Sequence, residues 1–465
     1  MDRARVNYQT MALVAGPATF SGETFLTPGG LPVADISSSD NRNLLKSIDR
    51  IQTFSYNYNI QRNEVRQLGK ASLVSRPIIN SPTINIMFDY LVANVRNESR
   101  LGFYVNYPVS GVSSYQPLYS DNFAVNLIGG FLERDLTKHI DLGSGNTLSW
   151  PMAYRDKRNL YLVTSPPGVD IYNPNYVSGN YNPYANNYQT YAFGNCYINA
   201  YSTEAAVGSM PRASVSYIAE NVLYHNTSSG VSVPSVNAKD RRVVSGVNFV
   251  LPPIYEAGGP TALNPGDITI DISSTGNPGM NHFGFKYSNI KLASYSINLG
   301  LDREDLSSIG YKLPWDRQIN LPVIADLSFN LVPGDNTTGS FADLINNDWN
   351  YDATIHLKNS ICPPELRTDV VRYDFKGLKA HSLNYGGGVG SSNSAAFSFS
   401  TELDPEDLTK GFFVSGILGY DESQDYPNHY LLIDDAAGAY PAGSDGSYLL
   451  QEDGYRLILD EGSPY

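Results

Sequence analysis

One sequence pattern occurs twice in this chain, and it constrains the fold more than any single motif does. Residues 51–69 read IQTFSYNYNIQRNEVRQLG, and residues 292–310 read LASYSINLGLDREDLSSIG. The two stretches lie 241 positions apart and share serine, asparagine, arginine and glycine at matching places. The match continues without a gap as far as Phe88 and Phe329. We infer that a whole domain is duplicated.

A second repeated block follows the first in both copies. VGSMPRASVSYIAE (207–220) lines up with VGSSNSAAFSFSTE (389–402) at an offset of 182. The first copy therefore holds about 59 additional residues between its blocks, mostly within 105–190. The predicted organisation is a first domain with an N-terminal arm and this insertion, a second domain, and an acidic β-rich C-terminal extension. Their expected bounds are 1–240, 241–410 and 411–465.

Apolar and polar residues alternate in both copies. Phe54, Tyr56 and Tyr58 alternate with serine and asparagine, as Tyr295 and Ile297 do in the second copy. This period of two predicts strands with one buried and one solvated face. Charged residues make up only 17% of the chain, and the abundant serine, asparagine, glycine and tyrosine suit strands and turns. The sequence predicts a mainly β fold.

The polar side of these strands carries serine, asparagine and aspartate without lysine or arginine. Such a face suits the wall of a channel that must not hold polyanions, and it equally suits an ordinary solvated sheet face. The residues expected on this face, and in the first interpretation facing a lumen, are Ser55, Asn57, Asn85, Asp89, Ser296, Asn298, Asp326 and Asn330.

The segment between the two strands of each copy is polar and ends in a shared glycine. This glycine is expected to adopt a backbone angle that other residues avoid. Arg62 with Glu64, and Arg303 with Asp305, form either local ion pairs in the turn or contacts to a neighbouring subunit. Exposed pairs stabilise a fold by only ~0–1 kcal/mol, so these pairs indicate a role in specificity rather than in stability.

The insertion is rich in tyrosine, asparagine, proline and glycine. Loops longer than ~15 residues are uncommon unless they are functional or disordered. Tyrosine among small polar residues provides an adaptable contact surface, so we consider a subunit or ring contact, a surface loop and a carbohydrate-binding platform. The candidate contact residues are Tyr176, Tyr181, Tyr184 and Tyr188.

Charge and motifs exclude several classes of function. The net charge is −14 and no basic cluster is present, so the chain is not expected to grip nucleic acid. Cys196 and Cys362 are isolated and are expected to be reduced core residues. No phosphate loop, nucleophile elbow or zinc-ligand spacing occurs, and we expect no catalytic residue, metal or cofactor. Neither a signal peptide nor a membrane span is expected.

The repeated blocks resemble those of bacteriophage tail-tube proteins. The first match is RIQTFSYNYNIQRNEVRQLGKASLVSRPIINSPTINIMFDY, and the later part of the domain is similar to NCYINAYSTEAAVGSMPRASVSYIAENV. The resemblance implies, for each copy, a β-sandwich or barrel with a short flanking helix. It covers roughly 45–100 with 190–225 and 285–345 with 375–405.

This resemblance also implies a function. Six such domains form a ring, and stacked rings form a hollow tube through which double-stranded DNA passes. Two linked domains per chain imply a homotrimeric, pseudo-hexameric ring located in the virion tail after assembly in the bacterial cytoplasm. The implied partners are further copies of the chain, a tape-measure protein, a tail terminator and baseplate or distal-tail proteins. A single non-stacking baseplate ring and a carbohydrate-binding tail adhesin are the alternatives.

Overall fold

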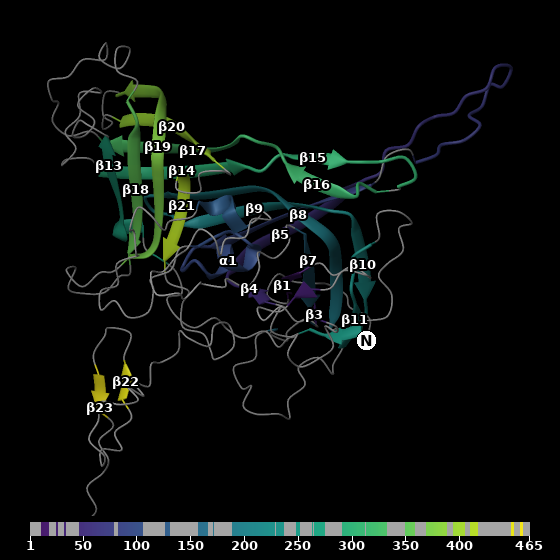
Figure 1. Ribbon diagram of the computed structural model, residues 1–465, viewed down its shortest axis with the longest axis horizontal. Coiled ribbons are helices and arrows are strands. Elements are labelled where there is room, and N and C mark those ends of the chain that lie inside the picture. The colour runs from purple at the N-terminus through teal and green to yellow at the C-terminus, as the bar shows by residue number, and fades with distance from the viewer. Residues whose placement is uncertain are drawn as a thin grey trace, which may run out of the picture.

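The computed structural model shows a mainly β protein with a large antiparallel sheet, which confirms the predicted fold class (Figure 1). The structure describes residues 11–17, 25–26, 32–33, 46–78, 82–105, 126–130, 157–165, 171, 188–227, 229–236, 248–251, 263, 265–274, 291–311, 313–332, 349–358, 369–387, 394–404, 410–416, 448–450 and 456–458.

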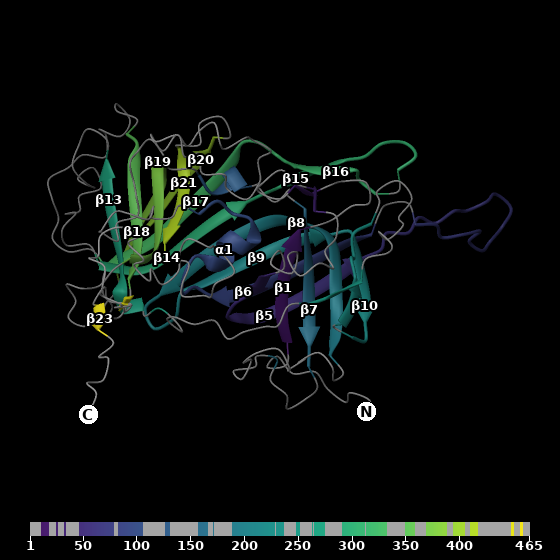
Figure 2. The same ribbon diagram turned by 60° about the horizontal axis from the view of Figure 1, so that its bottom comes forward.

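Eight strands of the 15-stranded sheet lie side by side as one continuous ladder. The first four belong to the first repeat and the last four to the second (Figure 2). In spatial order they are β5 (Ile51–Asn59), β6 (Thr83–Leu91), β9 (Arg212–Ala219), β8 (Gln189–Ala206), β14 (Lys291–Gly300), β17 (Val323–Val332), β20 (Ser394–Leu403) and β19 (Asp369–Gly386).

The two halves of this ladder have the same hydrogen-bond register. The β5–β6 pair shifts register between Ile51 and Thr53, and the β14–β17 pair shifts between Leu292 and Ser294, which lie 241 positions later. The β8–β9 and β19–β20 pairs also shift at matching places, separated by 182 positions. A bulge re-aims a strand, so the two halves bend alike. The domain boundaries remain predictions.

A second layer covers each half of the ladder. In the first half it contains β4, β1, β7, the first part of β8, and β10; in the second half it contains β13, β18, the first part of β19, and β21. The bounds are Lys46–Ile48 for β4, Met11–Pro17 for β1, Arg158–Thr164 for β7, Asn221–His225 for β10, Ile268–Ser274 for β13, Tyr351–Lys358 for β18 and Gly411–Gly416 for β21.

Two long strands join the layers. β8 and β19 are each 18 residues long and pair in both layers. Each contains one residue with positive φ between its two parts, Asn195 at 53° and Gly377 at 73°. Only glycine and, less often, asparagine adopt this conformation easily. These residues hold matching positions in the two repeats, so the same bend carries each strand between layers.

The remaining elements are short. The one α-helix among the described residues, α1 (Arg96–Leu101), ends at Gly102, which has a φ of 100°. A counterpart in the second copy would lie outside the described residues. Two 3-10 turns span Leu127–Gly130 and Pro265–Asp267, and the small hairpins are β2 (Phe25–Leu26) with β3 (Pro32–Val33), β11 (Ser229–Ser232) with β12 (Asn248–Val250), β15 (Arg303–Leu306) with β16 (Asp316–Ile319), and β22 (Tyr448–Leu450) with β23 (Arg456–Ile458).

The core lies between the ladder and the second layer. Phe88 and Phe329, which match at the 241 offset, are both 2% exposed. Phe329 stacks on Phe397 and Phe399 with centroid distances of 5.3 and 5.5 Å. These aromatic residues of the alternating pattern are therefore buried, as expected. Cys196 is also buried, and this burial raises the pKa of its thiol, as suits a structural cysteine. Cys362 lies outside the described residues.

Two segments outside the repeated blocks contribute core strands. β7 falls within the expected insertion at 105–190, yet every residue of β7 is buried between β1 and β8. β21 begins where the C-terminal extension was expected, and it pairs with β19 in the second layer. Sequence alternation does not reveal such strands because both of their faces are covered.

Candidate functional site: a polar sheet face, two edges and two arms

The outer face of the eight-stranded ladder carries nearly all the residues expected there. Its side chains alternate with buried apolar residues, most regularly along β17. Of the eight candidates, seven are exposed: Ser55, Asn57, Asn85, Ser296, Asn298, Asp326 and Asn330. Exposure places these residues on one face; that this face lines a lumen stays a prediction.

Asp89 differs from the other seven candidates. It is 6% exposed, and it forms an ion pair with Arg212 of β9, whose Nη1 lies 3.2 Å from the carboxylate Oδ2. An ion pair of this kind neutralises the aspartate at the border of the face. Period-two alternation placed Asp89 on the correct side of its strand, but it carries no information about a cation on another strand.

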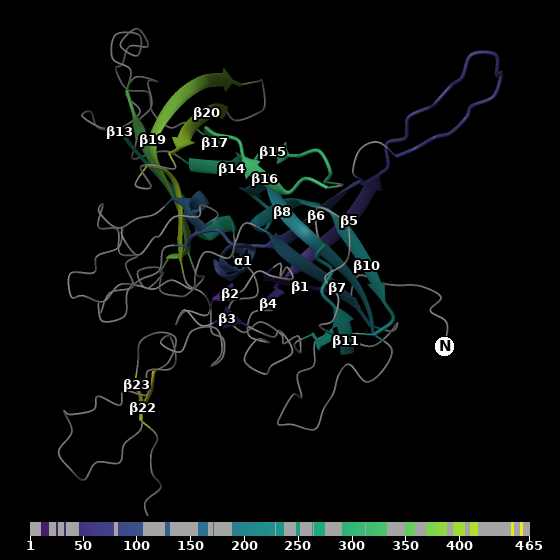
Figure 3. The same ribbon diagram turned by 45° about the vertical axis from the view of Figure 1, so that its right-hand side comes forward.

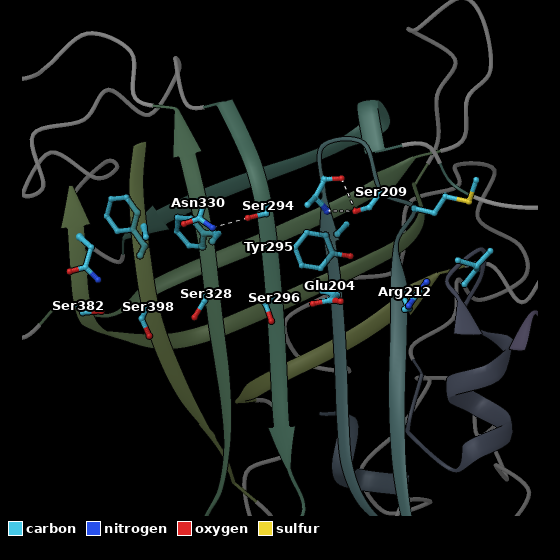
Figure 4. Close-up of a pocket in the computed structure, with 18 of the residues that line it drawn as sticks. Glu204, Ser209, Arg212, Ser294, Tyr295, Ser296, Ser328, Asn330, Ser382 and Ser398 are labelled. Carbon is cyan, nitrogen blue, oxygen red and sulfur yellow. Dashed lines mark hydrogen bonds between the residues drawn. The ribbon is translucent and has the colours of Figure 1, made fainter. Parts of the chain in front are cut away.

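Hydroxyl groups form a row across the ladder (Figure 4). Ser382, Ser398, Ser328 and Ser296 are consecutive partners across β19, β20, β17 and β14. Glu204 of β8 pairs with Ser296 and extends the row into the first half. The row lines a hollow of about 880 Å³. Small neutral side chains predominate along this row, and its end in the first half carries both charges, Glu204 and its ladder partner Arg212 on β9.

The two halves of the ladder meet inside the chain through β8 and β14. Ser296 pairs with Glu204, Ile297 with Thr203 and Asn298 with Ser202. Along the described residues, β5 pairs on one side with β6, and the last part of β19 pairs on one side with β20. The ladder thus ends in two strand edges, one on β5 and one on β19. β5 is the counterpart of β14, and β19 is the counterpart of β8, so the two end strands correspond to the two strands that meet in the middle.

Each repeat also carries an arm that extends from the ladder (Figure 3). The first arm runs between β5 and β6, with isolated bridges from Arg62 to Ile78 and from Val65 to Ser75. The second arm is the β15–β16 hairpin. The shared glycines at the tips, Gly69 and Gly310, have φ angles of 82° and 92°. The expected unusual backbone angle is confirmed.

The first arm contains local ion pairs. Glu64 Oε1 and Oε2 lie 3.0 Å from Arg76 and Arg66, respectively, and Arg62 donates to the carbonyl of Arg76 at 3.2 Å. These residues are exposed, and Figure 1 shows this arm reaching beyond the body of the molecule.

The second arm instead packs against the first repeat. Arg303 Nε donates to the Ile198 carbonyl at 2.6 Å, and its guanidinium lies 5.3 Å from the centre of the Tyr197 ring. Arg317 approaches the same ring at 5.9 Å and lies 3.6 Å from Glu220. Arg303 thus joins the two repeats within one chain, a contact that neither sequence interpretation anticipated. Its predicted partner Asp305 pairs with Arg317 at 3.2 Å.

Sequence reasoning missed Glu220 and Arg317 as a pair. Burial raises the pKa of Glu220, while Asn195 and Arg317 act in the opposite direction. A signal was present in the repeats: Arg76 matches Arg317, and a glutamate closes the second block in both copies. Nothing in the local pattern shows that these residues meet.

Of the four candidate contact tyrosines of the insertion, the structure describes one. Tyr188 is 5% exposed and belongs to a small hydrophobic cluster with Val14, Tyr161 and Val231, so its side chain packs inside its own chain. Tyr176, Tyr181 and Tyr184 lie outside the described residues.

A buried carboxyl group joins the two halves of the core. Glu98 of α1 accepts hydrogen bonds from Tyr90 at 2.8 Å and Tyr201 at 3.2 Å. Tyr373 and Tyr295, from the second repeat, lie next to this group. Burial raises the pKa of Glu98 to about 7, although the two tyrosine hydroxyls lower it. The sequence contains no periodic signal for this residue.

The described part of the chain has no cluster of three or more histidine, cysteine, aspartate or glutamate residues suited to a metal ion. Within those same ranges, no helix is long and apolar enough to cross a membrane.

Comparison with known proteins shows weak structural likenesses. No family model matches the chain, and no curated protein matches it. Among the solved structures that match, two are each similar to about a third of it. A chain of "Cryo-EM structure of the anti-feeding prophage (AFP) baseplate, 6-fold symmetrised" has 12% identity, covers 32% of this chain and 92% of its own, and gives a TM-score of 0.20. "Crystal structure of Hcp protein" has 6% identity, 32% and 98% coverage, and a TM-score of 0.18.

Proposed function

We propose that this chain is a structural protein of a bacteriophage tail. Three copies close a pseudo-hexameric ring of six repeats, and stacked rings form a tube whose lumen conducts DNA. The proposal assigns no catalytic role and no cofactor to the chain. Its partners are other copies of itself, a tape-measure protein that sets tube length, and proteins that cap each end.

The junction between β8 and β14 is the observation that carries the proposal. It shows how one repeat adds its first strand to the last strand of another repeat while the ladder stays continuous. The same two kinds of edge remain at the ends of the ladder, on β5 and β19. An unpaired edge favours pairing with another chain, and closed symmetry removes edges altogether. Three chains follow from the six-repeat ring that the family resemblance implies.

The intrachain junction predicts the register of the junction between chains. Applying the offsets of 241 and 182 to the β14–β8 pairs places Asn57 opposite Asn384 and Tyr56 opposite Tyr385 of the neighbouring chain. The corresponding pairs within the chain are Asn298 with Ser202 and Ile297 with Thr203. A shift of one residue would place polar side chains in the core, so the register is strongly specified.

The composition of the outer face suits a conduit for DNA. Lysine and arginine hold phosphates by releasing counterions. The row around Ser296 and Ser328 instead presents hydroxyls. Its charged end holds Glu204 and Arg212, and this arginine is ion-paired with Asp89. A surface of this kind lets a polyanion slide without binding it.

A cysteine cross-link tests the proposed ring. In chains with Asn57→Cys and Asn384→Cys, oxidation or a short thiol-reactive linker should join neighbouring chains into covalent dimers and trimers. Neither single substitution should give these covalent dimers and trimers. The positive control is Asn298→Cys with Ser202→Cys, which has the corresponding geometry inside one chain. The register control, Asn57→Cys with Ser382→Cys, should cross-link much less.

Negative-stain microscopy and solution mass complete the test. Six-lobed rings with threefold symmetry that stack into tubes are the expected result. Discrete rings that never stack would replace the tube by a single-ring baseplate component. Monomers that cross-link only in the intrachain control would overturn the ring itself.

A further inference from the structure

The two arms have the same internal contacts but very different surroundings, and this difference indicates an interface. We propose that the first arm docks on the second repeat of a neighbouring chain, with Arg76 facing Glu402 and Arg62 facing the carbonyl of Ala380. The inference rests on the proposed ring and adds the residues that specify its closure.

The contacts between the two arginines of each arm, and between the second arginine and a carboxylate, match in the two arms. Arg62 donates to the carbonyl of Arg76 at 3.2 Å, and Arg303 donates to the carbonyl of Arg317 at 3.0 Å. The guanidinium of Arg76 lies 3.0 Å from Glu64. In the second arm, Arg317 lies 3.2 Å from Asp305. Both arms therefore hold their second arginine in the same orientation.

The two arginines differ in exposure. The side chain of Arg76 is 59% exposed, whereas that of Arg317 is 3% exposed. The Arg317 guanidinium is covered by the first repeat, through Glu220 at 3.6 Å and the Tyr197 ring at 5.9 Å. Arg303 is fixed alongside by the Ile198 carbonyl. The first arm has matching contacts between its arginines, but among the described residues no other repeat covers its Arg76.

The counterpart of this docking surface is present on the second repeat. The 182 offset converts Ile198 into Ala380 and Glu220 into Glu402. Ladder pairing supports the conversion, because Ile198 pairs with Tyr217 and Ala380 pairs with Phe399 at matching positions beside the shared bulge.

Glu402 has the exposure that an interface residue needs in the separate chain. It lies near the end of β20 and is exposed, whereas Glu220 is buried beneath the second arm. Arg76 and Glu402 are thus two exposed, oppositely charged groups at positions whose counterparts form a buried ion pair. The second copy of this chain is the partner that fits them.

The interface between chains also departs from the junction within the chain. Lys379 stands where the first repeat has Tyr197, and Ser75 stands where the second arm has Asp316. The junction between chains therefore lacks the aromatic ring that two guanidinium groups contact within the chain. The cation of Lys379 stands in its place. Electrostatic attraction to Glu402 must carry more of this contact. We expect the junction between chains to be more sensitive to salt than the junction within the chain.

Charge reversal tests the inference. Arg76→Glu and Glu402→Arg should each raise the protein concentration needed for ring assembly by about tenfold or more, because each change juxtaposes like charges. The double variant should return it to within about threefold of the wild-type value. Assembly is followed by solution mass as a function of chain concentration at low and moderate salt.

Arg66→Glu is the matched control. Arg66 also pairs with Glu64 at 3.0 Å and is exposed, so its reversal introduces the same repulsion within the arm. Its counterpart at position 307 is a serine, so no docking contact corresponds to it. This variant should assemble within about twofold of wild type. Lys379→Tyr, which restores the aromatic platform, should assemble at lower concentration and with less dependence on salt.

The outcomes separate this inference from the proposed function. Wild-type rings that cross-link between Asn57→Cys and Asn384→Cys, together with unaffected assembly of Arg76→Glu, would overturn the docking of the arm and leave the ring intact. Failure of the double reversal to restore assembly, with each variant folded as judged by its melting temperature, would also overturn it. Wild-type chains that form no ring would remove both proposals.

Discussion

At the scale of single residues, Glu98 shows how burial changes the chemistry of an ordinary carboxyl group. Its pKa is about 7 in the folded chain, compared with 4.5 for the unperturbed group. The folded state therefore binds this proton more tightly than the unfolded state does. The contribution of Glu98 to stability is complete below the unfolded pKa and is lost as the pH rises towards the folded pKa.

We predict that the free energy of unfolding falls by up to about 3 kcal/mol between pH 4.5 and pH 7 because of this group alone, and that its contribution is constant above pH 7. The measurement is urea denaturation across this range for wild type and Glu98→Gln. An amide keeps an acceptor for Tyr90 and Tyr201 without titrating, so the difference between the two chains isolates Glu98. A difference that does not depend on pH would contradict the prediction.

At the scale of elements, the bends in β8 and β19 show how one long strand serves two layers. The position is asparagine in the first repeat and glycine in the second, with φ angles of 53° and 73°. An added Cβ at Gly377 would meet no atom within 4 Å. The conformational preference of the backbone is therefore the main cost of a substitution there.

Gly377→Ala should destabilise the chain by about 1–2 kcal/mol, since alanine disfavours the left-handed region. Gly377→Asn should cost less, because asparagine tolerates this region and occupies the matching position of the first repeat. Midpoints of urea denaturation compare the two variants. Equal stability of the alanine and asparagine variants would show that the left-handed backbone conformation does not determine the loss of stability.

At the scale of the whole molecule, the proposed ring assigns a role to the outer face. Asn85 and Asp326 match at the 241 offset, and both are exposed on this face. In a ring of three chains they would occupy six symmetry-related places. A lysine at each would create a ring of cations around the channel.

The double variant Asn85→Lys with Asp326→Lys should assemble normally but slow the passage of DNA, because phosphates bind where counterions are released. DNA ejection from reconstituted tails measures the passage, and added salt should relieve the delay. Asn85→Gln with Asp326→Asn is the neutral control. Unchanged ejection through lysine-bearing tubes would show that this face does not line the lumen.

The repeated pattern and its alternation, read from sequence alone, were enough to predict the strands and their buried sides. Phe88 and Phe329 lie in the core, and Asn298 and Asp326 lie on the outer face, as expected. The tip glycines were equally predictable, because a backbone angle is a local property. Strand alternation and turn chemistry depend on neighbours in the chain, and such information is present in any short stretch of sequence.

Tertiary structure alone decided which strands and charges meet. β8 reaches β14 across a long connection, and Arg317 reaches Glu220 although 97 positions separate them. β7 was hidden because a strand covered on both faces has no alternation. Asp89 and Tyr188 were expected to be accessible, yet neighbouring strands bury them. Pairing and burial depend on surfaces that exist only after folding, whereas the period of a strand is written along the chain itself.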